Sequence, residues 1–276
     1  MSQDHYCVLG NPVEHSRSPW IHTRFAELTG QSLSYGRQLV ELDKFHETLH
    51  RLQLEGFKGC NVTVPFKFEA AQAAQVRSPR AELAGAANVL TLRADGLHAD
   101  NSDGIGLVND LQNNAGVALQ GKALLLIGAG GAAAGVLGPL LEAGPARLTV
   151  VNRTHDKATA LVARHQALAR SHGVALDAPA IETLQGSFDV VINATASSLS
   201  GAAVPVPASV LRPGCLALDM MYGPAAQGFL DWAGAHGAQG RDGLGMLVEQ
   251  AAEAFALWRG VRPPSAQVLA ELRRQL

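Results

Sequence analysis

The sequence lacks the features that mark secreted, membrane-bound and nucleic-acid-binding proteins. Only three of its 276 residues are cysteines, and no C-x-x-C pair occurs, so neither a disulfide framework nor a structural zinc site is predicted. With 22 basic and 24 acidic residues and no basic stripe, neither nucleic acid nor an anionic membrane is expected as a partner. Residues 1–6 contain no basic or apolar segment of a secretory signal, so a cytoplasmic location is expected.

An uncharged stretch at residues 123–141 is long enough to suggest a membrane span. It contains several glycines and Pro139, however, and a turn signal interrupts it. A buried strand, a glycine-rich turn and a helix of small residues account for this stretch better than a span does.

Short β-rich runs alternate with amphipathic segments, and this order predicts an α/β fold. The first part of the chain predicts strands at 5–9, 34–40, 58–64, 87–92 and 96–99, with helices at 19–29, 44–55 and 103–114. Ser18 and Asp43 are expected to cap two of these helices at their N-termini. Gly30 and Gly56 are expected to follow the same helices in the left-handed conformation.

A second α/β series begins after residue 121. Its strands are expected at 123–127, 147–151, 189–193 and 215–220, and its helices at 132–143, 155–171 and after Pro224. Parallel strands joined by right-handed helical crossovers follow from this order. A last helix after Gly243 is expected to return to the first domain. Gln250 lies on its apolar face, where an amide needs a partner from the backbone or a ligand.

Two polar segments are candidates for a catalytic site. Residues 61–67 predict a buried strand that Pro65 ends and that delivers Lys67 at its end, as a candidate acid/base. Asp103 lies in a second polar cluster at residues 100–104. With the glycine-rich turn at 128–131, these segments suggest a proton-handling site beside a nucleotide site, in a cleft between two domains. A lysine that merely extends into solvent is the alternative.

The glycine-rich turn follows a predicted strand and precedes a predicted helix. There, Gly128, Gly130 and Gly131 would let backbone N–H groups approach a pyrophosphate. Residue 133, the third position of the usual fingerprint, is alanine, and an ordinary packing turn can carry the same pattern.

The next predicted strand ends in Asn152, Arg153 and Thr154, where an NAD site usually has a carboxylate for the ribose hydroxyls. Lys157 follows in the first turn of a helix, where the helix dipole disfavours a cation. A ribose 2′-phosphate held by Arg153, Thr154 and Lys157 resolves this conflict, so NADP is predicted rather than NAD. A solvated cluster balanced by Asp156 is the alternative.

Ser16 and Ser18 place two hydroxyls just before a helix start, which attracts carboxylates. The pair fits a receptor for a substrate carboxylate. Helix capping without a ligand fits the same residues equally well.

Seven segments together resemble shikimate dehydrogenase in order and spacing over essentially the whole chain. They are residues 16–19, 61–67, 85–88, 100–104, 128–132, 152–154 and 242–247. The resemblance implies the reversible NADPH-dependent reduction of 3-dehydroshikimate to shikimate in the aromatic amino-acid (chorismate) pathway. It also implies a substrate-binding catalytic domain at 1–104 plus 244–276 and a Rossmann-type NADP-binding domain at 105–243. A monomer or a homodimer is expected, without a metal.

The resemblance also assigns roles to individual residues. Lys67 would be the catalytic acid/base with Asp103 as its partner, and Ser16 and Ser18 would hold the substrate carboxylate. The ring hydroxyls would be addressed by Thr63, Asn88, Asp103, Tyr222 and Gln250. The cofactor would be bound by Gly128, Ala129, Gly130, Gly131, Ala132, Asn152, Arg153, Thr154, Lys157, Thr195, Met220 and Gly243.

Some positions depart from the family pattern. Lys157 stands where arginine is frequent, which keeps the charge but loses the bidentate fork. The turn at 193–197 has alanine where serine is usual, and an acidic residue of some relatives is missing near Pro79. None of these positions touches the expected proton transfer.

Three other functions compete with this interpretation. Residues 46–50 form the H-E-x-x-H motif of zinc proteases, but no downstream G-x-x-H completes a metzincin site and the segment has an ordinary buried face. A quinate or dual quinate/shikimate dehydrogenase has the same chemistry, although Arg153 and the two serines favour shikimate and NADP. A non-enzymatic NADP sensor would need neither Lys67 nor Asp103, and both are present.

Overall fold

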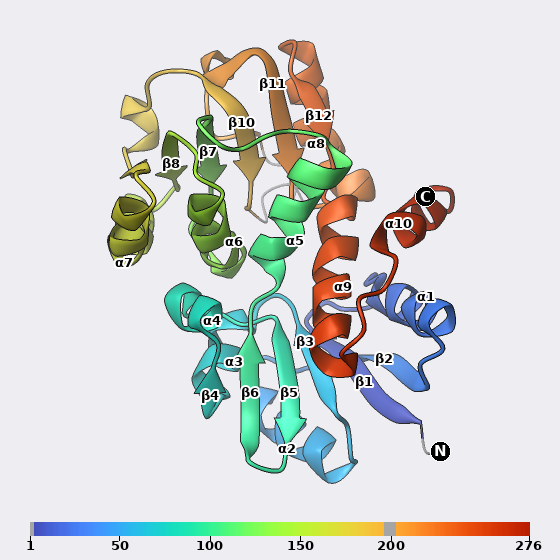
Figure 1. The fold of residues 1–276 in the computed structure, drawn as a ribbon. Helices are drawn as coiled ribbons and strands as arrows, with labels where there is room; N and C mark the ends of the chain where they lie inside the picture. The colour runs from blue at the N-terminus through green and yellow to red at the C-terminus, as the bar shows by residue number, and fades with distance from the viewer. Residues whose placement is uncertain (1–2, 196–202) are drawn as a thin grey trace. The chain divides into compact units, whose positions relative to one another are not determined.

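A computed structural model describes residues 3–195 and 203–276 and contains two compact α/β units (Figure 1). Unit 1 comprises Met1–Gly106 and Val248–Leu276, and unit 2 comprises Leu107–Leu247. Within the described ranges, no helix is both long and apolar enough to cross a bilayer. The strands and helices of the two units confirm the predicted α/β fold class.

Unit 1 is built on a six-stranded mixed sheet with the order β2-β1-β3-β5-β6-β4. Strand β5 runs antiparallel to its neighbours β3 and β6, and the other pairs are parallel. The strands are β1 (Asp4–Gly10), β2 (Leu33–Leu39), β3 (Gly59–Val62), β4 (Val76–Arg77), β5 (Val89–Arg93) and β6 (Gly96–Asp100).

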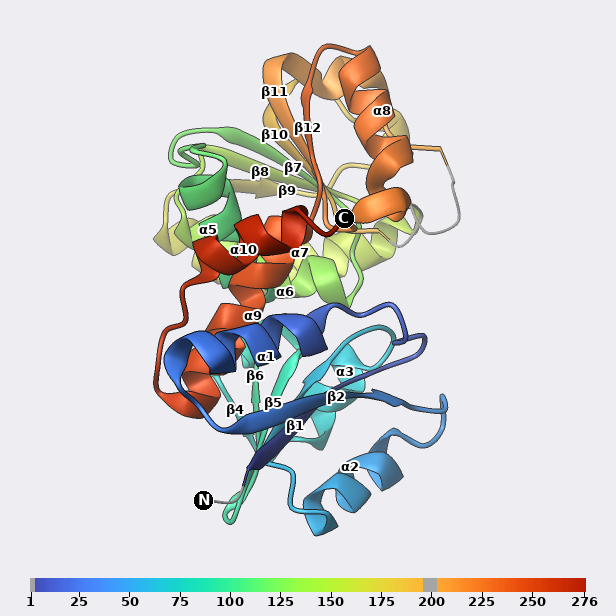
Figure 2. The same ribbon diagram turned by 90° about the vertical axis from the view of Figure 1, so that its right-hand side faces the viewer.

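Helices cover both faces of this sheet, with α1 and α9 on one side and α2 on the other (Figure 2). The chain leaves unit 1 within α5 and returns within α9, so the C-terminal helices belong to unit 1 as predicted. The helices are α1 (Ser18–Thr29), α2 (Phe45–Leu54), α3 (Lys67–Ala73), α4 (Pro79–Ala84), α5 (Asp103–Asn109), α9 (Leu244–Arg259) and α10 (Ser265–Arg273).

The alternation of side chains along β1 divides the core of unit 1 between the two sheet faces. Cys7 and Leu9 belong to a buried cluster with residues of α2 and α3. Tyr6 points to the opposite face, where its ring stacks on Trp258 of α9 with the centroids 4.7 Å apart. Both faces of the strand are therefore buried, which explains its apolar composition.

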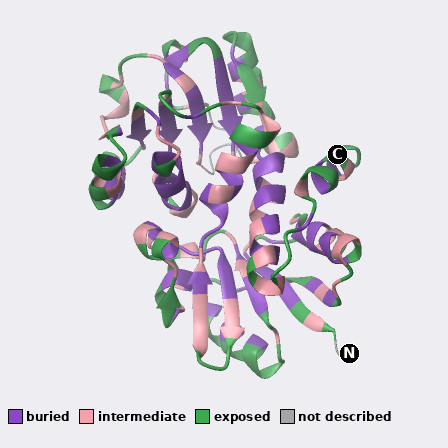
Figure 3. Cartoon of the chain, in the orientation of Figure 1, coloured by how far each residue is buried: buried purple, intermediate pink, exposed green. Residues whose placement is uncertain are grey.

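Unit 2 is built on a six-stranded sheet with the order β12-β11-β10-β7-β8-β9, in which all pairs are parallel. This is the doubly wound arrangement in which ligands bind where the strand order reverses, here at the carboxyl ends of β7 and β10. The elements are β7 (Ala123–Ile127), α6 (Gly131–Glu142), β8 (Arg147–Val151), α7 (His155–Ser171), β9 (Ala175–Asp177), β10 (Phe188–Asn193), β11 (Leu211–Asp219), α8 (Gln227–Ala235) and β12 (Gln239–Arg241). Its central strands are buried, as the purple ribbons in Figure 3 show.

Two predicted N-caps are wrong. Helix α1 begins at Ser18 with Arg17 in the cap position, and α2 begins after Lys44 rather than Asp43, in both cases without a side-chain cap. The N–H of Ser18 instead donates a hydrogen bond to Ser16 Oγ at 3.3 Å. The predicted left-handed glycines after both helices are present, at φ 64° and 81°.

The predicted position of Lys67 at a strand end is also wrong. Strand β3 ends at Val62, and the N–H of Phe66 donates to the Thr63 carbonyl at 3.0 Å to form a turn. Lys67 is the first residue of the short helix α3, which the sequence pattern did not predict. The carbonyl of Lys67 accepts a hydrogen bond from the Ala87 N–H at 2.8 Å, and this bond fixes the start of α3 beside β5.

Candidate active site

The Lys67 amine and the Asp103 carboxylate meet in unit 1, although 36 residues separate them in the chain. The Nζ atom lies 2.6 Å from Oδ2, and the side chains are 14% and 1% exposed. Within the described residues Asp103 is the side-chain partner of the amine, so two of its three N–H donors remain for a ligand. The predicted pair is therefore assembled in a partly enclosed position.

Asp103 is held in place by its own loop and by a buried amide. Its N–H donates to Asn101 Oδ1 at 3.1 Å as α5 begins. Its Oδ1 atom accepts from Asn88 Nδ2 at 2.8 Å, which leaves Oδ2 for the lysine. Both carboxylate oxygens are thus oriented before any ligand binds.

The Asn88 amide connects the pair to α9. Its Nδ2 lies within hydrogen-bond distance of Asp103 Oδ1, Ser102 Oγ (3.1 Å) and Gln250 Oε1 (3.0 Å). An amide nitrogen has two hydrogens, so three acceptors compete for two donors. One acceptor of this cluster can therefore receive a hydrogen bond from a ligand hydroxyl. The predicted residues Lys67, Asp103, Asn88 and Gln250 form one connected set.

The two serines lie at the start of α1, where Pro19 has no N–H and the Ser18 N–H donates to Ser16 Oγ. Ser18 is buried and Ser16 is half-buried. Thr63 lies beside Gly10, whose missing side chain makes room for it, since a Cβ atom there would be 2.4 Å from Thr63 Cγ2. No direct hydrogen bond joins these three hydroxyls to Lys67 or Asp103 within the described residues.

Two residues that the sequence analysis did not select connect the serine region to the amide cluster. The Tyr35 hydroxyl donates to Asn61 Oδ1 at 2.6 Å, and Asn61 Nδ2 donates to the Asn88 carbonyl at 3.1 Å. Burial raises the pKa of Tyr35 well above 10, and a hydrogen bond with Ser18 opposes that shift. Asn61 was part of a matched motif, but its partners are far away in the sequence, so its contacts could not be predicted locally.

The glycine-rich turn of unit 2 lies at the carboxyl end of β7. Gly128 has a φ of 119°, and a Cβ atom on it would lie 3.1 Å from the Ala194 carbonyl oxygen and 3.2 Å from Thr195 Cγ2. Gly130 caps α6, and Gly131 and Ala132 form its first turn. Among the residues that the structure describes, no side chain caps this helix, so its backbone N–H groups can receive an anion.

The end of β8 carries two cations beside the start of α7. Arg153 and Lys157 are exposed, and within the described residues neither side chain forms an ion pair or a hydrogen bond. Asp156 forms no ion pair with either of them in this part of the described chain. Asn152 Nδ2 instead donates to the Thr154 carbonyl at 2.9 Å and stabilises the turn between strand and helix. The arrangement leaves both cations available to a phosphate.

A third segment of unit 2 brings Met220 and Gly243 together. A Cβ atom on Gly243 would lie 2.3 Å from the Met220 carbonyl oxygen, so only glycine fits at this contact. Thr195 Oγ1 donates to Asn193 Oδ1 at 2.7 Å, which fixes the turn after β10. Of the turn at 193–197, where the family pattern has serine in place of an alanine, residues 196–197 lie outside the described residues. Tyr222 is half-buried in unit 2, two residues after Met220.

The H-E-x-x-H segment lies elsewhere in unit 1, on α2. Its two histidines are exposed and line a cavity of about 180 Å³ with Gln53, Gln75 and Leu97. In the part of the chain that the structure describes, no group of three or more His, Cys, Asp and Glu side chains could hold a metal ion. The motif therefore lacks the third ligand of a catalytic zinc site.

Comparison with known proteins gives matches over both units. Residues 8–90 match the family model for the shikimate dehydrogenase substrate binding domain, residues 110–201 that for shikimate / quinate 5-dehydrogenase, and residues 243–273 that for the shikimate 5′-dehydrogenase C-terminal domain. The shikimate dehydrogenase (NADP(+)) of Acidovorax sp. (strain JS42) is 66% identical over 270 residues, which cover 98% of this chain and 96% of that protein.

Solved structures agree with these sequence matches. The shikimate 5-dehydrogenase of Thermus thermophilus, in complex with NADP(H) and shikimate, has a TM-score of 0.86 at 32% identity and covers 99% of this chain and 100% of its own. An Ael1 enzyme from Pseudomonas putida has a TM-score of 0.89 at 45% identity, with 98% of each chain covered. The predicted enzyme class and NADP cofactor are confirmed, and this chain belongs to the shikimate dehydrogenase family.

Proposed function

We propose that Lys67 and Asp103 form the acid/base pair with which this enzyme carries out the family reaction, the reversible NADPH-dependent reduction of 3-dehydroshikimate to shikimate. As the sequence resemblance implies, we place the reaction in the aromatic amino-acid (chorismate) pathway. The observation that carries the proposal is the 2.6 Å contact between the amine and the almost fully buried carboxylate. A quinate-specific enzyme is not favoured, because the curated relatives are NADP-dependent shikimate dehydrogenases.

The reduction of the substrate carbonyl requires a proton at the carbonyl oxygen. NADPH, when bound, supplies a hydride to the carbonyl carbon of 3-dehydroshikimate. Negative charge then develops on the carbonyl oxygen, and the Lys67 ammonium stabilises this charge and donates its proton to form the hydroxyl. In the oxidation direction the neutral amine accepts that proton. Asp103 aims the amine and balances its charge in the protonated state.

The remaining polar residues of unit 1 would orient the substrate. The hydroxyls of Ser16 and Ser18, at the start of α1, form a receptor for the substrate carboxylate. Thr63, Asn88 and Gln250 would address the ring hydroxyls, and the surplus of acceptors around the Asn88 amide supports this role. Tyr222 is proposed as a further ring contact from unit 2.

The cofactor-binding residues are proposed in unit 2. The uncapped N-terminus of α6, with Gly128, Ala129 and Gly130 before it, fits a pyrophosphate. The unpaired cations Arg153 and Lys157, with Thr154, fit the ribose 2′-phosphate that distinguishes NADP from NAD. Thr195, Met220 and Gly243 would lie along the nicotinamide half.

The test of the acid/base proposal is the replacement Lys67→Ala. We expect kcat to fall by about a hundredfold to ten-thousandfold in both directions, because the oxygen loses its proton donor. Absorbance of NADPH follows turnover with shikimate and with quinate. Lys44→Ala is a matched control, since Lys44 also stands beside a helix start and pairs with a carboxylate, Glu47, but is exposed. A Lys67→Ala enzyme with the kcat of the wild type would exclude Lys67 from the mechanism.

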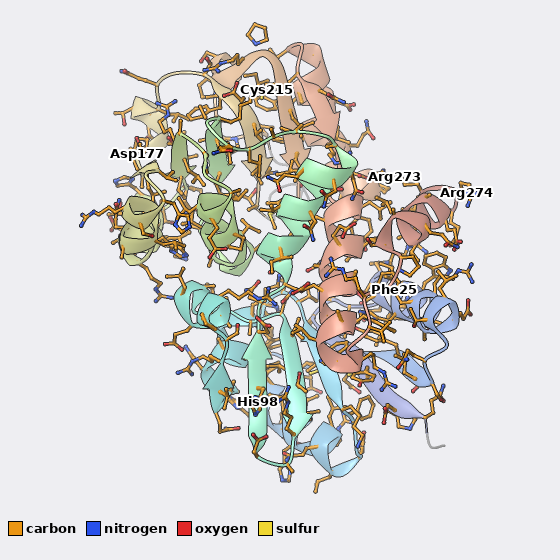
Figure 4. All side chains as sticks on the ribbon, in the orientation of Figure 1. Phe25, His98, Asp177, Cys215, Arg273 and Arg274 are labelled. Carbon is orange, nitrogen blue, oxygen red and sulfur yellow. The ribbon has the colours of Figure 1, made fainter. Side chains whose placement is uncertain are left out.

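The compartment is proposed from the cysteines. Cys7, Cys60 and Cys215, the last labelled in Figure 4, are all free and buried. Burial raises the pKa of Cys7 to about 12 and that of Cys215 to about 11, so these thiols are protonated and unreactive at neutral pH. Free thiols are typical of a reducing cytoplasm, so we propose a cytoplasmic location.

We propose that the protein is a monomer or a homodimer. Sedimentation of the purified protein distinguishes a 28.9 kDa monomer from a dimer of twice that mass.

A further inference from the structure

His22 on α1 is a fully buried histidine, and neither of its ring nitrogens has a hydrogen-bond partner among the described residues. Burial lowers its pKa to about 3, so the ring is neutral at physiological pH. The Asn61 side chain opposes this shift, although the two groups do not reach normal hydrogen-bond geometry. A buried imidazole without polar partners is costly and needs an explanation from its surroundings.

The surroundings of His22 are aromatic. Its ring stacks on Tyr35 of β2, with the centroids 4.2 Å apart and the planes inclined by 3°. Trp258 and Phe255 of α9 contact the ring at 5.6 and 6.2 Å, and Phe25, labelled in Figure 4, meets it edge-on at 6.1 Å. Because aromatic rings surround it, the imidazole is held parallel to the Tyr35 ring. The stack therefore fixes the direction in which the tyrosine hydroxyl points.

That hydroxyl is the first link of a hydrogen-bond chain towards the catalytic pair. It donates to Asn61 Oδ1 at 2.6 Å, which determines which end of the amide is the acceptor. Asn61 Nδ2 is then directed at the Asn88 carbonyl, 3.1 Å away. The side chain of Asn88 holds Asp103 Oδ1 at 2.8 Å, and Asp103 holds Lys67.

We propose that His22 and Tyr35 are positioning residues: the imidazole stacks on the tyrosine ring and keeps its hydroxyl on Asn61, which holds Asn88 and thereby Asp103 in place for Lys67. Neither residue touches the reacting atoms. The inference rests on the proposed acid/base role of Lys67 and Asp103. Ser18 interacts with the same hydroxyl, so the chain also connects the carboxylate receptor to the proton-transfer pair.

The test begins with Tyr35→Phe, which keeps the stack and removes only the hydroxyl. We expect kcat per folded enzyme to fall about tenfold, the effect of one directed hydrogen bond, while KM for NADPH stays unchanged. Tyr6→Phe is the matched control: Tyr6 pairs with Tyr35 in register on β1 and stacks on the same Trp258, but its hydroxyl interacts with Arg259. Tyr6→Phe should retain the wild-type kcat.

A double-mutant cycle separates positioning from a general loss of stability. Asn61→Ala removes the next link, and adding Tyr35→Phe to it should reduce kcat no further, because the hydroxyl then has nothing to orient. His22→Phe should keep kcat within about twofold since it preserves the stack, whereas His22→Ala should lower kcat as Tyr35→Phe does. Additive losses in the cycle, or a Tyr35→Phe enzyme with wild-type kcat, would overturn the proposal.

Lys67→Ala is assayed in the same series, so the two proposals can fail separately. Full activity in Lys67→Ala rejects the acid/base pair. If Lys67→Ala is inactive and the Tyr35 and Asn61 replacements are silent or additive, the acid/base pair stands and only the positioning chain is rejected.

Discussion

Each unit contains a cation and a carboxylate in contact, with the carboxylate almost fully buried, and the two pairs differ in the cation. In unit 1 the pair is Lys67 with Asp103, 14% and 1% exposed. In unit 2 it is Arg241 with Asp110, 18% and 0% exposed, joined by two hydrogen bonds of 2.8 and 2.5 Å. Burial and charge are therefore alike in the two pairs.

The cations determine what each pair can do. An ammonium can lose a proton within the working pH range of proteins, whereas a guanidinium stays charged and offers a rigid two-pronged fork. The hydrogen bonds that Arg241 donates to Asp110 raise the pKa of the guanidinium still further. The arginine pair thus suits a permanent structural contact, and the lysine pair suits a group that must give and take a proton.

The largest expected effect comes from exchanging the cation in unit 1. Lys67→Arg keeps the positive charge beside Asp103 but removes a proton that can be transferred, so we expect kcat to fall by about a hundredfold to ten-thousandfold. Steady-state assays with shikimate and NADP measure this loss. If the Lys67→Arg variant kept the wild-type kcat, positive charge alone would be sufficient, and the proposed difference between the lysine pair and the arginine pair would be wrong.

The second prediction concerns the pair in unit 2. Arg241→Met leaves the Asp110 carboxylate buried without a counterion, so we expect the free energy of unfolding to fall by about 3–5 kcal/mol. Urea unfolding measures the change. Arg212→Met is the control in the same unit, because the pair of Arg212 and Asp189 is much more exposed and should contribute about 1 kcal/mol or less. Equal losses in the two variants would contradict a special role for the buried pair.

The two units also differ in how far the sequence predicts them. In unit 2 the strands at 123–127 and 147–151 and the helix at 155–171 have the predicted bounds, because apolar runs and flanking turn residues define them locally. In unit 1 the short helices α3 and α4 were missed. Helices of seven and six residues are too short to show a periodic pattern. The Ser78 cap before α4, which accepts from the Ala81 N–H, was a usable signal.

The predictability of the candidate sites follows the same division. Arg153 and Lys157 could be selected because the signal, a missing carboxylate after a strand and a cation at a helix start, lies within a few residues. Tyr35 and Asn61 could not, since they meet across 26 residues and two strands of the sheet. Long-range hydrogen bonds depend on the register of the strands, which residue patterns do not fix.

The third prediction addresses the cofactor selectivity of unit 2. Arg153→Ala removes a cation proposed to contact the 2′-phosphate, so KM for NADPH should rise about tenfold to a hundredfold while KM for NADH stays unchanged. Because the site is exposed, added salt should weaken NADPH binding in the wild type more than in the variant. Arg170→Ala, at the other end of α7, is the control. A parallel rise of both KM values would contradict a contact specific to the 2′-phosphate.

The smallest expected effect is the pH dependence of stability that His22 adds to unit 1. Its pKa is lowered from 6.5 to about 3 in the folded state, so between these values the unfolded chain binds a proton that the folded chain does not. The contribution of His22 to the free energy of unfolding is fully present above pH 6.5 and falls by about 1.4 kcal/mol per pH unit as the pH decreases below it.

The variant His22→Phe lacks this contribution, so the difference in unfolding free energy between variant and wild type should change progressively from about pH 7 to about pH 5.5. The lowered carboxylate pKa values of Asp100 and Asp189 act equally on both proteins and cancel in this difference. A difference that stays constant with pH would mean that folding does not lower the pKa of His22.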